Sequence, residues 1–127
     1  MDINTHQKID QSLCGRPLMI EDGISRVELL TTGAMAADNS GLVHGGFIFG
    51  LADYAAMIAV NHPNVVLGAA EVTFLKPVEV NETVIAEASV DDSEGKKRRV
   101  AVSVKRGPEL VFRGIFTCFV LDSHVLG

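Results

Sequence analysis

Aromatic residues and cysteines are scarce in this sequence. Its 127 residues include no tryptophan, one tyrosine and two cysteines. Cys14 and Cys118 lack the spacing of a metal or redox motif, so we expect free thiols in a reducing compartment, taken here as the cytoplasm. The four histidines have no ligand spacing, so we do not expect a metal. The net charge of −5 and the few aromatics argue against a nucleic-acid partner.

Targeting, membrane-spanning and linker segments are also missing. Residues 1–7 have neither the basic nor the apolar part of a signal peptide. The long apolar stretch 42–60 contains a histidine, an aspartate and several glycines, and has no basic or aromatic anchors beside it, so we do not expect a membrane partner. There is no repeat or Pro/Ser-rich linker. We therefore expect one domain over residues 1–127, in which residues 1–20 form a helical extension or cover a sheet edge.

The most informative segment of the chain is residues 40–60. After a turn, it is apolar on every side of the expected helix, and a helix without a polar face is a buried one. Three features do not fit an ordinary core helix. Glycines at positions 45, 46 and 50 weaken it, a histidine stands at its start, and an aspartate interrupts the apolar run. The helix should end near Val60, before the helix-breaking residues 61–64.

The rest of the chain predicts an antiparallel sheet. A short amphipathic helix at 4–14 precedes a first strand at 24–30. Four further strands are expected at 65–75, 82–90, 98–105 and 110–121, with a loop at 91–95 and a turn at 106–109. Short turns join the last three strands, which favours a meander. Because one flat sheet face cannot cover a helix that is apolar all round, the sheet must curl around it, or a second chain must close over it.

This pattern resembles the hotdog-fold thioesterase superfamily, in particular its PaaI-like acyl-CoA thioesterase branch. The resemblance rests on Gly41-x-x-His44-Gly45-Gly46, on Asp53 nine residues after the histidine, and on the Phe-Leu-Lys-Pro run at 74–77. It covers roughly residues 24–121. It implies an α+β fold, with a five-stranded antiparallel sheet curled around one long central helix. It also implies cofactor-free hydrolysis of an acyl-CoA thioester by a homodimer or a dimer of dimers (a homotetramer).

The resemblance assigns roles to residues of the central helix. Members of this branch use a backbone N–H at the helix start to polarise the thioester carbonyl, which here falls on Gly46 or Gly45. Their helix carboxylate, here Asp53, acts as nucleophile or as the base for water. Physical chemistry supports both roles. A helix N-terminus stabilises a developing oxyanion, and burial raises the pKa of a carboxylate towards that of a base near neutrality.

Structural alternatives stay open for these residues. The paired glycines would also allow a tight turn, and a buried aspartate would also accept hydrogen bonds from a neighbouring loop. Spacing gives one independent result. Gly46 and Asp53 share a helix face but lie about 10 Å apart along its axis, so one carbonyl cannot lie close to both. If both act on one substrate, they come from different chains of a dimer.

Further candidates surround these positions. His44 either orients a loop or touches the thioester. Relatives place an asparagine six residues before the histidine, whereas here Asp38 holds that position and Asn39 follows it. The remaining candidates are Tyr54, Met57, Glu71, Phe74 and Phe47 for the substrate, and Lys76, Lys96, Lys97, Arg98, Arg99 and Arg106 for the phosphates of CoA. The basic run 96–99 is equally explained as the solvated start of a strand.

Three functions follow as hypotheses. The first is acyl-CoA thioester hydrolysis. The second is a non-catalytic module that binds or senses acyl-CoA, because the asparagine is displaced by one position and no hydroxyl for holding water is evident on the strand after the helix. The third is hydration or dehydration of acyl-CoA, which requires His44 close to a carboxylate.

Overall fold

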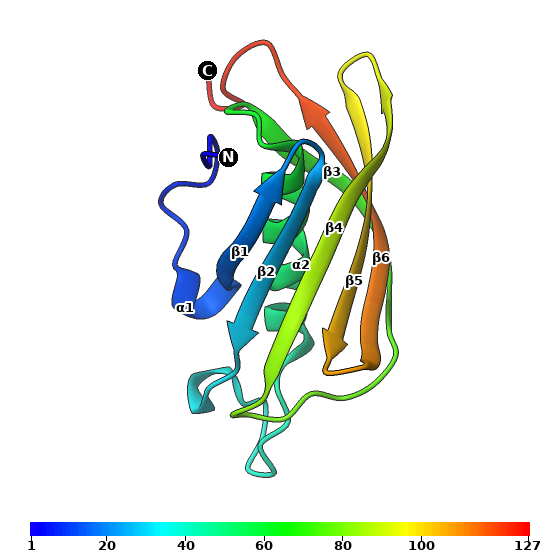
Figure 1. Ribbon diagram of the computed structural model, residues 1–127. Helices are drawn as coiled ribbons and strands as arrows, with labels where there is room; N and C mark the ends of the chain where they lie inside the picture. Colours follow the sequence, from blue (N-terminus) through cyan, green and yellow to red (C-terminus); the bar gives the residue numbers. More distant parts are fainter.

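The structure, a computed structural model, describes all 127 residues and consists of one antiparallel sheet packed on one long helix (Figure 1). The sheet has six strands in the order β1-β2-β4-β5-β6-β3. The strands are β1 (Arg16–Glu21), β2 (Ile24–Leu30), β3 (Val65–Phe74), β4 (Thr83–Glu94), β5 (Lys97–Arg106) and β6 (Glu109–Val120). The helices are α1 (Gln11–Cys14), the 3-10 turn η1 (Gly33–Met35) and α2 (Gly45–Val60).

The fold class is confirmed, with a correction to the number of strands. The sheet has six strands instead of five, because β1 pairs antiparallel with β2 in a segment that we expected to form a helical extension or to cover a sheet edge. The helix expected at 4–14 is reduced to the four residues of α1, which Asp10 caps and Gly15 ends at a φ of +107°. The sequence pattern did not reveal β1 because a register shift between Pro17 and Met19 interrupts its alternation.

The central helix and the meander are confirmed. β4, β5 and β6 pair with one another in sequence order. β4 is longer than predicted and continues to Glu94, so the acidic residues expected to form a loop belong instead to a strand. A register shift follows Val90, and the Asp91 carboxylate lies 3.0 Å from the Arg99 guanidinium of β5. Charge pairing across the two strands accounts for acidic residues in an extended segment.

The core lies between α2 and the inner face of the sheet. Val84 of β4, Val100 of β5 and Phe116 of β6 are fully buried there, as are Leu51 and other apolar residues of α2. The helix is therefore buried along most of its length, as its composition predicts. None of the helices combines the length and the hydropathy needed to cross a membrane.

The N-terminal segment is held against the C-terminal end of α2. The Asn4 N–H donates to Asn61 Oδ1 (2.7 Å), and Asn61 Nδ2 donates to the Asp2 carbonyl (2.7 Å). Asn61 itself is the left-handed C-cap of α2. The two chain termini consequently lie at the same end of the molecule (Figure 1).

Candidate active site

Asp53 is the most unusual polar residue of the fold. It lies in the middle of α2, and its Oδ1 atom is the one buried side-chain nitrogen or oxygen without a hydrogen-bond partner. Because burial penalises the charged form, the pKa of Asp53 rises from its ordinary 3.8 to about 6. No loop supplies a hydrogen bond to this oxygen. The carboxylate is thus half-protonated at mildly acidic pH and ionised above it, as a general base requires.

Two thiols lie close enough to Asp53 for its charge to act on them. Burial first, and then the charge of Asp53, raise the pKa of the Cys118 thiol on β6 to about 12. Burial and the charges of Asp10 and Asp53 also raise the pKa of Cys14 on α1. Both cysteines are free, and both are kept as thiols instead of thiolates by this environment. Neither cysteine therefore has the thiolate form that a nucleophile requires.

The start of α2 presents backbone donors and one imidazole. His44 is the N-cap, and its Nδ1 accepts a hydrogen bond from the Gly46 N–H at 2.9 Å. Gly45 lies against the ring of Phe74 on β3, where an added Cβ would come within 3.1 Å of the ring. The two glycines therefore serve different contacts, one with the capping histidine and the other with β3.

Gly46 and Asp53 lie on one side of α2 together with Gly50. The spacing of four and then three residues brings the three onto one helix face, and α2 is regular from Gly45 to Val60. Gly46 and Asp53 remain about 10 Å apart along the axis. An added Cβ at Gly50 would meet nothing within 4 Å, so no contact inside this chain explains the glycine there.

The inner face of β3 beside this helix side is left uncovered. Ala70 and Phe74 pair in register with Phe116 and Phe112, both of which are 0% exposed. Phe74 is nevertheless 53% exposed, and Ala70 is exposed too. The exposed apolar side of β3 adjoins the first turn of α2 through the contact between Phe74 and Gly45, and on α2 Gly46 is exposed while Gly50 and Asp53 are half-buried.

The predicted substrate residues separate into two groups. Tyr54 and Met57 are 2% and 1% exposed and belong to the core, whereas Phe74 lies on the exposed side of β3 and Phe47 is half-buried. Glu71 lies on the outer face of the sheet, because its neighbour Ala70 shares the inner side with Phe116. It lines an outer hollow of about 480 Å³ and does not share a cavity with Asp53.

The loop before α2 is organised by its aspartate. Asp38 Oδ1 accepts hydrogen bonds from the backbone N–H groups of Ser40 (2.9 Å) and Leu42 (3.3 Å). This carboxylate therefore shapes the turn that leads into the helix. Asn39 is exposed at the tip of the same turn.

The basic residues predicted to bind the CoA phosphates differ in whether their side chains already pair with other groups of the chain. Arg106 is bound to Glu82, Glu109 and the Pro77 carbonyl, and its hydrogen bonds to carboxylates raise its pKa. Lys96 pairs with Asp122, Arg99 pairs with Asp91, and Arg98 donates to backbone carbonyls. Lys97 and Lys76 are exposed and pair with no carboxylate, and Lys76 lines a hollow of about 320 Å³ that reaches Gly45 and Phe74.

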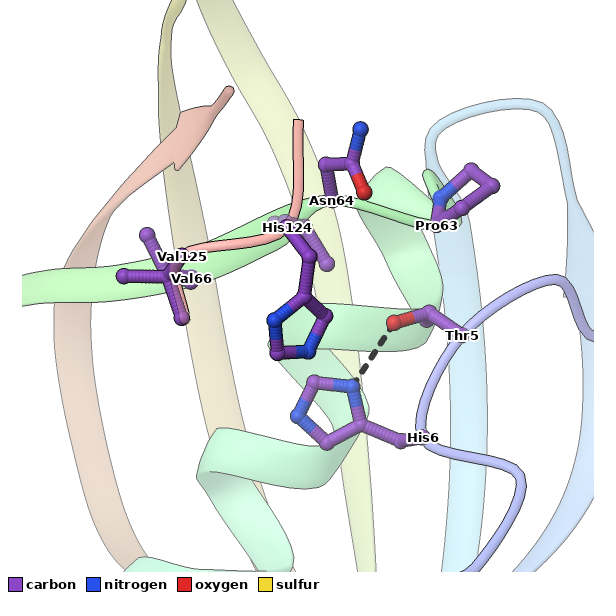
Figure 2. A pocket seen from close by; sticks show the side chains of 8 residues that line it. Thr5, His6, Pro63, Asn64, Val66, His124 and Val125 are labelled. Carbon is purple, nitrogen blue, oxygen red and sulfur yellow. Dashed lines mark hydrogen bonds between the residues drawn. The ribbon is translucent and has the colours of Figure 1, made fainter. Parts of the chain in front are cut away.

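A separate hollow of about 270 Å³ lies at the other end of α2 (Figure 2). His6 and His124 both line it (Figure 2), and the His6 Nδ1 is 2.8 Å from the Thr5 hydroxyl. Burial lowers the pKa of His6, which favours its neutral form. Neither Asp53 nor Gly46 lines this hollow.

Sequence reasoning did not identify the open surface on β3. One signal for it was present. The ten residues Val65–Phe74 contain one charged residue and no proline, although the strand lies at a sheet edge, where charges and prolines commonly prevent further pairing. The opposite edge, β1, contains Pro17, two charged ends and a register shift. Strand order, which the sequence does not reveal, was needed to see the contrast.

Comparison with known proteins is consistent with this geometry. Residues 40–112 match the thioesterase superfamily profile. A methylthioribose-1-phosphate isomerase of Aquifex aeolicus is 52% identical over 123 residues, 96% of this chain but 27% of that protein. Transcription factor FapR of Caldanaerobacter subterraneus is 31% identical over 85 residues, 67% of this chain and 42% of FapR. The chain thus spans less than half the length of either curated relative.

Solved structures agree over nearly the whole chain. Uncharacterized protein PH1136 from Pyrococcus horikoshii superposes with a TM-score of 0.99 at 50% identity, covering 100% of this chain and 98% of that one. A mutant of the phenylacetic acid degradation protein PaaI from Thermus thermophilus superposes with a TM-score of 0.81 at 25% identity, covering 87% and 96%. The chain therefore belongs to the thioesterase superfamily and has its hotdog fold.

Proposed function

We propose that this protein hydrolyses an acyl-CoA thioester to a free acid and CoA. The observation that carries the proposal is the buried, unpartnered carboxylate of Asp53 on a helix whose N-terminus presents glycine amides. A buried carboxylate without a partner destabilises the fold, so its presence on α2 is explained by chemistry and not by stability. Membership of the thioesterase superfamily and similarity to PaaI point to the same reaction.

The reaction needs one base and one oxyanion donor. Ionised Asp53 takes a proton from a water molecule whose oxygen attacks the thioester carbonyl carbon. The carbonyl oxygen becomes an oxyanion and is stabilised by the Gly46 N–H, with the positive end of α2 behind it. When the intermediate collapses, the C–S bond breaks, and the leaving thiolate receives the proton that Asp53 took up. Direct attack by the carboxylate, with an anhydride intermediate, uses the same two groups.

These two groups are brought together by a second copy of the chain. Because Gly46 and Asp53 of one helix are about 10 Å apart, one carbonyl cannot contact both. The exposed side of β3 is apolar, and this edge strand has one charged residue and no proline to prevent pairing with another strand. A two-fold axis beside β3 would pair the two edges and run the two helices antiparallel, so that Gly46 of each chain faces Asp53 of the other. Gly50 would then allow the close approach of the helices.

The decisive activity test compares Asp53→Asn with a matched control. CoA release from a panel of acyl-CoA thioesters is followed with a thiol reagent. Asp22→Asn, on the exposed turn between β1 and β2, serves as the control and should retain the wild-type rate. Asp53→Asn should abolish release while the circular dichroism spectrum stays unchanged. If wild-type protein releases no CoA above background across short, long and aromatic acyl groups, the hydrolase proposal is wrong.

The composite site has its own test, because inactive variants should complement each other. Gly46→Pro removes the amide donor in the first turn of α2, where the N–H has no partner in the helical ladder, and it also displaces the His44 ring. Mixed with Asp53→Asn, it should form heterodimers in which one of the two sites is intact. With random pairing of equal amounts, half of the dimers are mixed, so about one quarter of the wild-type activity should return. If the mixture stays inactive although heterodimers form, both groups belong to one chain or do not act together.

A second function is favoured by one comparison. The similarity to transcription factor FapR is with a protein whose name denotes regulation instead of hydrolysis. In this second hypothesis, the protein binds an acyl-CoA at the same surface without cleaving it. Thermal stabilisation by acyl-CoA without any CoA release would support binding alone.

A further inference from the structure

One hydrogen-bond donor of the candidate site has two competing acceptors. The Gly46 N–H, which the proposed reaction assigns to the thioester oxygen, donates to His44 Nδ1 at 2.9 Å. A single N–H directed at an imidazole nitrogen is not available to an incoming carbonyl. For the site to accept a substrate in the proposed way, the imidazole must therefore leave this position.

The glycine at position 46 is what lets the imidazole come so close. An added Cβ there would lie 2.8 Å from His44 Nδ1 and 3.1 Å from Cε1, and any other residue would displace the ring. The sequence thus provides both the capping side chain and the space that it occupies. This pairing accounts for Gly46 separately from Gly45, whose contact is with the ring of Phe74.

The geometry also allows the imidazole to move away. His44 is exposed, and the hydrogen bond to Gly46 is the one that its side chain makes. Because Nδ1 accepts this bond, the proton of the neutral ring is on Nε2. The ring is otherwise in edge contact with Phe47, at a centroid distance of 6.4 Å and an angle of 84°. Rotation about its side-chain bonds breaks one hydrogen bond and no salt bridge.

We propose that His44 is a positioning residue that occupies the Gly46 N–H in the empty site and yields it to the acyl oxygen of the substrate. In the empty site, the cap keeps the first turn of α2 intact and the donor aligned along the helix axis. On binding, one acceptor replaces another on the same N–H. The inference rests on the proposed function in one respect, namely that an acyl-CoA oxygen is the incoming acceptor.

The two acceptors then compete, so removing the imidazole should tighten binding. His44→Ala leaves the donor without a competitor, whereas His44→Asn supplies a side-chain oxygen that caps helices well. A non-hydrolysable acyl-CoA thioether probe should bind His44→Ala about three to ten times more tightly than wild type, from the usual net strength of such a bond. His44→Asn should bind it with nearly the wild-type affinity. A histidine that polarised the carbonyl itself would give the opposite result, with weaker binding in both variants.

A spectroscopic measurement tests the displacement without relying on activity. In protein labelled with nitrogen-15, NMR should detect a scalar coupling between the Gly46 amide nitrogen and His44 Nδ1 across their hydrogen bond in the free chain. It should disappear when the thioether probe saturates the site, and it should be absent from His44→Ala. The proposal is overturned if the free wild-type chain shows no such coupling, if the coupling persists with probe bound, or if His44→Ala binds more weakly. Probe binding with a persistent coupling would overturn this inference alone, whereas a failure of the probe to bind would overturn the proposed function as well.

Discussion

Replacing Asp53 by asparagine should make the protein more stable at neutral pH. The pKa of Asp53 in the folded chain is about 6, against an ordinary value of 3.8, because burial disfavours the charged form. Between these two values the folded state holds more protons than the unfolded state, so the stability contributed by this group falls as the pH rises. The difference between the two pKa values corresponds to a destabilisation of the folded state by about 3 kcal/mol at pH 7.

The size of the effect makes it measurable. Asparagine fills nearly the same volume without a charge, so Asp53→Asn avoids this penalty. At the usual unfolding entropy for a chain of this length, about 3 kcal/mol raises the melting temperature by about 10 °C. The difference in the free energy of unfolding between variant and wild type should be largest above pH 7, decrease through pH 6 and vanish below pH 4. Calorimetry or chemical denaturation at fixed protein concentration, over this pH range, measures it.

Asp122 is a control aspartate whose replacement should change the stability in the opposite direction. Asp122 is exposed, and its hydrogen bond and ion pair with Lys96 lower its pKa. Its contribution is therefore present at neutral pH and lost as the pH falls, so Asp122→Asn should give a slightly less stable protein at pH 7. If Asp53→Asn is no more stable than wild type at pH 7, or if the difference does not depend on pH, the carboxylate has a partner in solution. The central reasoning about the site would then be wrong.

Four further outcomes are expected. The kcat/KM for acyl-CoA hydrolysis should rise with pH through about 6 as Asp53 loses its proton and then level off, as a pH–rate profile would show. Gly50→Ala should stabilise the isolated chain by up to about 1 kcal/mol but weaken dimerisation, measured by sedimentation, if the helices approach closely there. Gly114→Ala should destabilise the fold by about 1–3 kcal/mol in denaturant titrations, because its Cβ would lie 2.9 Å from a carbonyl oxygen of β3. Lys97→Ala should weaken CoA binding in calorimetric titrations, whereas Arg106→Ala should lower the melting temperature and leave that affinity unchanged, because its guanidinium is already bound to two carboxylates.

Local chemistry in the sequence was sufficient to predict the central helix and five of the six strands, and to single out Asp53 as a candidate. The run of apolar residues around Asp53 predicted a buried helix, and its carboxylate stood out because burial of a charge is costly wherever it occurs. Alternating valines predicted β4 and β5 for the same local reason. Strand β1 escaped prediction because its register shift removes the alternation on which such predictions depend.

Only the tertiary structure decided which surfaces meet. Glu71 and Ala70 are neighbours in sequence, yet pairing with β6 turns one outward and the other inward, and register depends on contacts between segments far apart in the chain. The cap formed by His44 on Gly46 likewise depends on a side-chain position that spacing alone leaves open. The sequence therefore determined which residues are candidates for the chemistry, while their directions, their burial and the open edge at β3 followed from long-range packing, because burial and strand order are properties of the whole fold.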